Sequence, residues 1–288
     1  MRKYEINHML ENKNDRQKYI GKILESNNCG KFKILGVYDI AENGSKNYVV
    51  EFVDTKYQTV ATYLQIRNLR IKDNYYPSVY NIGYIGDYEG KVSKNKYYTI
   101  WHSMIQRCYG SKDKLKTYNN VKISKEWHNF TNFANDIEKL IGYDNIAKYP
   151  NIKFELDKDI LSDKNNKIYS KETCCFIPHA LNMFFVGKKS RNAKKYKGVY
   201  YNYKLKTFVA HANFEKINYR KDGFHNPLDA YVWYYNAKKA MLQKYFKEDF
   251  SFVDSRIKNA MIEKLYQESR DAEKIEGKKI DVVKGYYY

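Results

Sequence analysis

Short runs of alternating apolar and polar residues occupy the N-terminal part of the chain. They lie at 31–38, 47–54 and 57–64, with a weaker run at 66–71, and their period of two is typical of β-strands. We therefore expect a small antiparallel sheet or barrel as a domain over residues 1–75. Its near-neutral charge and its lack of clustered reactive side chains favour a structural or accessory DNA-contacting role over catalysis.

The hydrophobic period lengthens in the middle of the chain. The stretch at 73–97 is rich in Gly and Tyr, and we expect an irregular linker there. Residues 99–109 and 126–142 have the three-to-four spacing of amphipathic helices. Residues 151–187 then predict a hairpin with a polar turn, followed by a short apolar helix. We expect these elements to form a second module over 95–187.

A third unit is expected over 195–270. From Tyr196 onward the sequence predicts three strands, then a helix with Asn226 as its N-cap and Pro227 as its first residue. A further helix around 252–270 follows. The expected fold class is therefore α+β, with three small domains: a β domain, a degenerate ββα module, and a three-stranded sheet with a helix.

The positive charge of the chain indicates what kind of partner it binds. The chain has 288 residues, with 52 Lys and Arg against 33 Asp and Glu, and a formal net charge of +19. The balance is +2 over 1–90, +6 over 91–187 and +11 over 188–288, so the charge rises toward the C-terminus. Residues 188–221 alone hold 11 basic residues and one acidic residue among many aromatics. A polyanion is the expected partner, because each cation set against a phosphate releases counterions.

Composition also excludes several classes of protein. Hydrophobic residues make up 43% of the chain, enough to fill a core, which excludes a wholly disordered or collagen-like protein. No run of about 18 apolar residues and no signal-peptide core occurs, so we expect no membrane partner and a cytoplasmic location in a bacterial host cell. The four cysteines lack a CxxC spacing and are expected to be reduced thiols.

Four polar residues between 157 and 182 have a spacing that suits a metal site. Asp157 and Asp159 lie two apart on an expected strand and so share a face, and His179 and Asn182 are one helical turn apart. Carboxylates and an amide suit a hard divalent cation, which can stabilise the leaving oxygen of a phosphodiester while a base activates water. The alternative is a plain surface turn, with His179 only capping the helix.

Ordered motifs run through the middle module: Trp101, Met104 and Arg107-Cys108-Tyr109, then YNNVKISKEWHNFTNF (118–133), then ELDKDILSDKNNKIYSKETCCFIP (155–178), then Asn182. Over residues 95–187 these motifs resemble a phage-borne family of HNH-type endonucleases, many of them homing enzymes. The resemblance implies a ββα-metal module in which Asp157 is the acidic metal ligand, Asn182 is a ligand from the helix, and Mg²⁺ or another divalent metal is the cofactor. Lys158 stands where that family places its histidine base. We therefore expect His179 to be the catalytic base, with Asp159 assisting.

The C-terminal unit carries a second set of motifs: Gly198-Val199, Phe208-Val209-Ala210, Gly223-Phe224, Leu228-Asp229-Ala230-Tyr231 and Asn236-Ala237-Lys238. Over about 195–245 it resembles the Apetala / ethylene-response-factor type of DNA-binding domain. That resemblance implies a three-stranded sheet in the major groove, with outward-facing strand residues reading bases and phosphates. The candidate DNA-binding residues are Lys204, Lys206, His211, Asn213, Lys216, Arg220 and Lys221.

The sequence thus predicts a phage or mobile-element protein that binds double-stranded DNA and acts as a divalent-metal-dependent, HNH-like DNA endonuclease. The alternative is a DNA-binding protein without nuclease activity. Such a protein would act as a regulator or as an inhibitor of a host DNA-targeting defence system, with a host defence protein as partner. An RNA-binding protein is a weaker third alternative, because the strands lack the aromatic and glycine signature of common RNA modules. The sequence leaves open whether the protein forms a homodimer.

Overall fold

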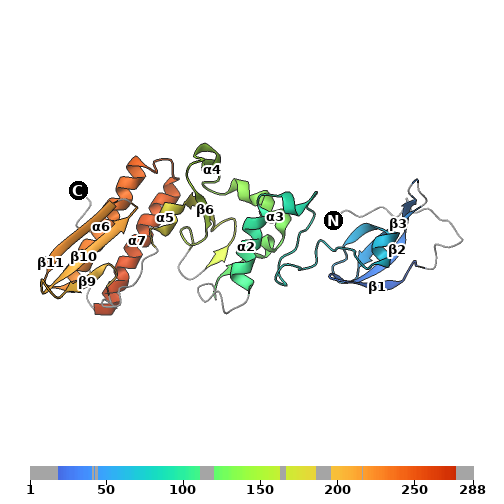
Figure 1. Cartoon of the computed structure of the whole chain (residues 1–288), viewed down its shortest axis with the longest axis horizontal. Coiled ribbons are helices and arrows are strands. Elements are labelled where there is room, and N and C mark those ends of the chain that lie inside the picture. Colours follow the sequence, from blue (N-terminus) through green and yellow to red (C-terminus); the bar gives the residue numbers. More distant parts are fainter. Residues whose placement is uncertain are drawn as a thin grey trace. The chain divides into compact units, whose positions relative to one another are not determined.

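The chain has a mixed α+β fold, which confirms the predicted class at this level (Figure 1). The computed structural model describes residues 19–40, 42, 45–110, 120–162, 167–185, 196–215 and 217–276, with side chains as far as residue 270. The chain divides into two compact units, Met1–Ile137 and Glu138–Tyr288. The predicted domain ranges 1–75, 95–187 and 195–270 divide the chain differently and stay a prediction.

The N-terminal sheet has four antiparallel strands in sequence order, as the alternating pattern predicts. The strands are β1 (Ile23–Ser26), β2 (Gly30–Ile40), β3 (Lys46–Phe52) and β4 (Gln58–Thr62). Alternate side chains of β2, including Phe32 and Ile34, are fully buried, and Val50 and Phe52 of β3 pack in the same core. This burial fixes the register of the sheet, because a one-residue slip would turn these side chains to solvent.

The prediction of a strand at 66–71, from the weaker alternating run, is wrong. The chain instead forms α1 (Tyr63–Arg67), and Leu69 has a left-handed φ of 54° just after it. The Thr62 hydroxyl accepts the Gln65 N–H at 3.2 Å, and the Gln65 side chain accepts the Thr62 N–H at 2.8 Å. This reciprocal capping starts the helix at a place where the apolar pattern alone favours a strand.

Two aromatic-rich helices organise the remaining described part of the first unit. The elements are η2 (Val92–Lys94), α2 (Tyr98–Tyr109), β5 (Lys122–Ile123), η5 (Lys125–His128), α3 (Phe130–Asp136) and η6 (Ile137–Lys139), the last of which continues into the second unit. Trp101 and Trp127 are fully buried, and the Trp101 indole N–H donates to the Trp127 carbonyl at 2.8 Å. The helix predicted over 126–142 is therefore a series of short helical segments. Asn129 caps the main segment by accepting the Thr131 N–H.

The stretch at 73–97 is largely irregular, as predicted, yet it packs against α2 and α3. A Cβ atom added to Gly83 would overlap the side chains of Ile105 and Trp101. Tyr84 exchanges backbone hydrogen bonds with the chain just before α3: its N–H donates to His128, and its carbonyl accepts from Phe130. These contacts make the stretch part of the folded unit and not a free connection.

The second unit follows the predicted order of a hairpin, a short helix, three strands and two long helices. Its elements after η6 are α4 (Asp144–Lys148), β6 (Phe154–Asp157), β7 (Ile168–Tyr169), β8 (Cys175–Pro178), α5 (His179–Met183), β9 (Val199–Asn202), β10 (Thr207–Phe214), β11 (Ile217–Phe224), α6 (Pro227–Glu248) and α7 (Ser255–Glu276). β6 pairs with β8 antiparallel, and β10 is the central strand of the sheet β11-β10-β9.

One hydrophobic core joins the hairpin and α5 to the C-terminal sheet and helices. Ile177 of β8 and Leu181 of α5 belong to the same buried cluster as Met241 of α6 and Ile257 of α7. In addition, the buried Lys238 ammonium of α6 donates to the Phe184 carbonyl at the end of α5, at 3.0 Å. The predicted nuclease-like hairpin and the predicted DNA-reading sheet are therefore packed together within one unit (Figure 1).

Within the described part of the chain, no helix is both long enough and apolar enough to cross a membrane.

Candidate functional site

The C-terminal sheet has one face packed on α6 and one face open. Ala210, Ala212 and Phe214 alternate along β10, are buried, and face α6. The two alanines let the helix approach closely. His211 and Asn213 lie between them in the sequence, so their side chains point away from α6 toward solvent. The strand pattern therefore produces one sealed face and one polar face.

The open face, defined here by His211, Asn213, Asn218 and Arg220, is assembled by the pairing of β10 with β11. His211 lies opposite Arg220, and Asn213 lies opposite Asn218. His211 Nε2 is 2.8 Å from Asn218 Oδ1, and the Arg220 guanidinium pairs with Asp222 at 3.0 Å. All these side chains are exposed or half-buried. The open face therefore offers hydrogen-bond donors and acceptors together with one cationic group, the Arg220 guanidinium.

Lys221 does not belong to the open face. It lies opposite Ala210, so its side chain starts on the face that packs on α6, and its ammonium is 5.5 Å from the centre of the Phe224 ring. A bulge in β11 comes directly after Lys221. Two residues lie between Lys221 and Phe224 on β11, but only one lies between their partners Ala210 and Phe208 on β10. Adjacent residues on a strand point to opposite faces, so Arg220 and Lys221 occupy different environments.

The two lysines predicted in the first hairpin, Lys204 and Lys206, are exposed in the turn between β9 and β10. The turn is fixed by Asn202, whose side-chain oxygen accepts the N–H groups of Lys204 and Leu205 at 3.0 and 3.2 Å. Lys216, the remaining predicted DNA-binding residue, lies outside the described residues.

Asp157, the predicted metal ligand, is held in a tight turn at the end of β6. Its Oδ1 accepts the N–H groups of Asp159 and Ile160 at 2.9 and 2.8 Å, and the residue is only 9% exposed. Burial raises the pKa of this carboxyl above its ordinary value, although the hydrogen bond from Ile160 opposes that effect. β6 thus ends at Asp157, and Asp159 lies in the turn after it, so the expectation that the two aspartates lie on one strand and share a face is wrong.

Lys158 and Asp159 form an ion pair beside this turn. The Lys158 ammonium is 2.7 Å from Asp159 Oδ2, and Lys158 is only 6% exposed. Lys158 is therefore directed to the neighbouring carboxylate. Asp159, predicted to assist catalysis, has its charge partly neutralised by this contact.

Glu155 is a functional candidate that the sequence analysis missed. His179 Nδ1 lies 2.9 Å from Glu155 Oε1, Asn182 Nδ2 donates to Oε2 at 2.9 Å, and Lys153 pairs with Oε1 at 2.8 Å. Burial alone would raise the pKa of Glu155, but the bonds from these three partners outweigh it and lower the pKa to about 2. Asn182 thus bonds Glu155 and not Asp157, and the predicted residues His179 and Asn182 are brought together through it.

This cluster can orient an imidazole. The Nδ1 atom of His179 is covered and faces Glu155, while the side chain as a whole is 43% exposed, so the exposed part is the rest of the ring. The Glu155 carboxylate 2.9 Å away favours a proton on Nδ1, which would leave Nε2 to accept one, although the two groups are not aligned as a hydrogen bond. The signal for Glu155 was present in the sequence, because Glu155 and Asp157 are two apart on one strand and share a face.

The donor chemistry near Asp157 fits a hard divalent cation. The carboxylate of Asp157 and the amide of Asn182 are ligand types that Mg²⁺ accepts, but no contact joins the two residues, because Asn182 bonds Glu155. Among the described residues, no group of three or more His, Cys, Asp or Glu side chains is arranged to hold a metal. Cys174 adds no nucleophile, because burial raises the pKa of its thiol to about 12.

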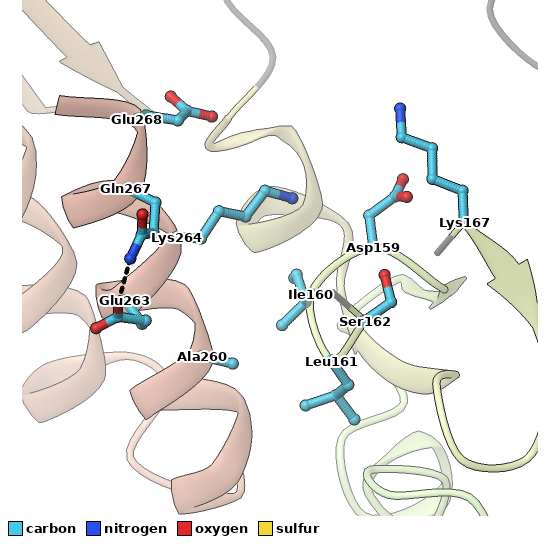
Figure 2. Close-up of a pocket in the computed structure, with 10 residues that line it drawn as sticks. All are labelled: Asp159, Ile160, Leu161, Ser162, Lys167, Ala260, Glu263, Lys264, Gln267 and Glu268. Carbon is cyan, nitrogen blue, oxygen red and sulfur yellow. Dashed lines mark hydrogen bonds between the residues drawn. The ribbon is translucent and has the colours of Figure 1, made fainter. Parts of the chain in front are cut away.

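A cleft of about 820 Å³ lies beside Asp159, between the loop after β6 and helix α7 (Figure 2). Asp159, Ile160 and Lys167 line one side of it. Lys264 extends from α7 toward the loop, and Glu268 lies one turn further along the helix (Figure 2). The cleft therefore gives Asp159 a solvent-filled space lined by both acidic and basic groups.

No protein-family model, no curated protein and no solved structure matches this chain.

Proposed function

We propose that the protein binds double-stranded DNA through the open face of its C-terminal sheet. The observation that carries this proposal is the division of the sheet into a face sealed by α6 and an open face with Arg220, His211 and paired asparagines. The major groove of B-DNA admits a two-stranded β-ribbon, and the residues of the open face all lie on the β10–β11 pair. Of the two faces of the sheet, only this one is available to a large partner.

The side chains of the open face suit a duplex chemically. An arginine can form two hydrogen bonds with guanine, an asparagine can do so with adenine, and lysines at the rim contact phosphates. Lys204 and Lys206 lie in the adjoining turn, in a unit that belongs to the most basic part of the chain. The sequence resemblance to the Apetala / ethylene-response-factor domain supports the same mode of binding, and the resemblance of residues 95–187 to phage-borne HNH-type endonucleases supports a phage or mobile-element origin.

Two neighbouring cations provide a matched test of this face. Arg220→Ala should weaken duplex binding about tenfold and lower the slope of log affinity against log salt by about one, because one contact is lost. Lys221→Ala removes the same formal charge one residue away, but from the other face, and should change both quantities much less. Equal effects of the two substitutions would mean that net charge, and not the open face, governs binding. Competition with RNA in the same assay tests the RNA alternative.

A second function, metal-dependent hydrolysis of the bound DNA, is favoured by the contact between His179 and Glu155. In this proposal Nε2 of His179 takes a proton from water, whose oxygen attacks the phosphorus while the bond to the leaving oxygen breaks. Glu155 holds the ring and stabilises the imidazolium that forms. A divalent metal, when bound through Asp157 and Asn182, would stabilise the charge on the leaving oxygen.

Cleavage of phage and host DNA with Mg²⁺ or Mn²⁺ tests this second function. His179→Ala should lower the rate about 10²–10⁴-fold, as expected for loss of a general base, and Asp157→Ala should abolish cutting while DNA binding persists. Undiminished cutting by His179→Ala would refute its role as base. Tight binding by the wild type with no cutting in either metal would favour the regulator or defence-inhibitor alternative, with the ββα module as scaffold.

A further inference from the structure

A cavity of about 860 Å³ lies in the first unit, apart from the sites described above. It is lined by the turn between β1 and β2 (residues 26–29), by residues 69–74 with Ser78, and by parts of 85–98. A space of this volume is typical of sites that hold small organic ligands. The chemistry of its lining indicates which class of ligand it suits.

Hydrogen bonds between these segments hold the lining in place. The Ser26 hydroxyl donates to the Ile71 carbonyl at 2.8 Å. The Asn74 carbonyl accepts the N–H groups of Ile85 and Gly86 at 2.9 and 2.8 Å. The cavity is therefore formed without a ligand, so a ligand that enters it pays little for ordering the chain.

The charged groups of the lining make the cavity positive. Arg70, Lys72 and Lys91 are exposed, and within the described residues none of their side chains forms an ion pair or a hydrogen bond. The one carboxylate among the described lining residues, Asp73, is buried and accepts the Thr55 hydroxyl at 2.6 Å. Three cations without partners favour a ligand that carries more than one negative charge.

Polar and apolar groups complete the lining. Four amide and hydroxyl side chains form no hydrogen bond in the part of the chain that the structure describes: Asn28, Asn74, Ser78 and Ser93. Ile85, Val92 and the Tyr88 ring supply apolar surface. The Tyr88 ring lies 5.2 Å from Phe130, centre to centre, and its hydroxyl accepts a hydrogen bond from Asn95 at 2.8 Å. The cavity thus offers cations, groups that both donate and accept, and a surface for a flat ring.

We infer that this cavity binds a nucleotide through its phosphates and its base. The phosphates contact Arg70, Lys72 and Lys91 through charge-assisted hydrogen bonds. The amides and hydroxyls bond the edges of the sugar and the base, whose ring lies on the apolar side chains. An inorganic anion would use only the cations, whereas a nucleotide uses the whole lining. The site is independent of the proposed DNA binding, because the cavity belongs to the first unit and the DNA-binding sheet to the second.

Calorimetric titration of the full chain tests the site, with ATP, GTP, CTP and UTP as probes. At about 0.15 M salt, attraction between exposed charges is screened beyond about 8 Å, so binding reports close contacts. At least one nucleotide should bind at one molecule per chain. It should bind at least about tenfold more tightly than inorganic triphosphate, which has no base to place on the apolar surface. Failure of all four to bind, or equal affinity for triphosphate, would overturn the inference.

Two nearby lysines provide a matched control. Lys91→Ala removes a cation of the lining and should weaken nucleotide binding about tenfold. Lys94→Ala removes the same charge three residues later, outside the lining, and should change the affinity much less. Equal effects would mean that net charge governs binding and would overturn the site. Arg220→Ala, on the DNA-binding sheet, should leave nucleotide affinity unchanged, and a loss there would move the nucleotide to the second unit.

The end of a nucleic-acid strand carries the same groups as a free nucleotide. A short single-stranded oligonucleotide is therefore the second probe, added to the complex with the bound nucleotide. Displacement that Lys91→Ala weakens would place a strand end in the cavity, and no displacement would assign the cavity to free nucleotides. Either result keeps the nucleotide site and identifies its source.

Discussion

Gly198 lets the start of β9 lie directly against the ring of Tyr234 in α6, and we predict that it is essential for holding the sheet on its helix. Its φ is +75°, a left-handed value that costs an alanine about 1–2 kcal/mol. A Cβ atom at this position would also overlap Cδ2 and Cε2 of the buried Tyr234 ring. Overpacking of a filled core costs about 1–3 kcal/mol more. Gly198→Ala should therefore destabilise the second unit by about 2–5 kcal/mol.

Gly223 is the matched control for this prediction. It lies in the bulge of β11 with a φ of +86°, but a Cβ atom added there would meet no atom within 4 Å. Gly223→Ala should therefore cost only the backbone term of about 1–2 kcal/mol. Amide hydrogen exchange of β10, read by mass spectrometry, measures the opening free energy of this sheet in the full chain. Equal effects of the two substitutions would refute the contact between Gly198 and Tyr234 as a determinant of stability.

Three other substitutions test the charges of the second unit. Asp222→Asn should tighten DNA binding by about threefold at low salt, because it releases Arg220 from its ion pair, and the gain should be smaller at high salt. Weaker binding would contradict the role of Arg220 as a DNA-binding residue. Glu155→Gln should make the loss of stability at acid pH less steep. The pKa of Glu155 is lowered to about 2 from an ordinary 4.5, so its ionised carboxylate stabilises the fold above pH 4.5 and this contribution is lost as the pH falls from 4.5 to 2. An acid transition as steep as that of the wild type would contradict it. Burial lowers the pKa of Lys238 to about 8 from 10.5, so the wild type should gain up to about 1.4 kcal/mol per pH unit relative to Lys238→Met as the pH rises from 8 toward 10.5. A pH-independent difference in unfolding free energy would show that Lys238 titrates normally.

Local patterns were sufficient to predict most of the fold. The alternation of Ala210 and Ala212 with His211 and Asn213 predicts a strand with one apolar face, and Asn226 with Pro227 predicts the start of α6 where it is observed. These signals are strong because burial and capping depend on neighbouring residues. The run at 66–71 failed because a capping box at Thr62 competes with a weak strand pattern.

The candidate site was less predictable because it depends on pairing between distant residues. Nothing local shows that Asn182 and His179 both meet Glu155, since that contact follows from the packing of α5 on β6. Likewise, Lys221 looks equivalent to Arg220 in the sequence. Alternation along the strand puts the two side chains on opposite faces, but only the register of β11 against β10 shows which of them faces α6.

Site-specific crosslinking tests the central claim most directly, because it reports which face of the sheet and helix unit touches DNA. A photoreactive benzoylphenylalanine replaces either Asn213, on the open face of β10, or Gln243, exposed on α6. Each variant is irradiated with duplex DNA at a salt concentration at which both bind. DNA binding through the open face predicts crosslinks from position 213 and none from position 243. Crosslinks from position 243 with none from position 213 would contradict it.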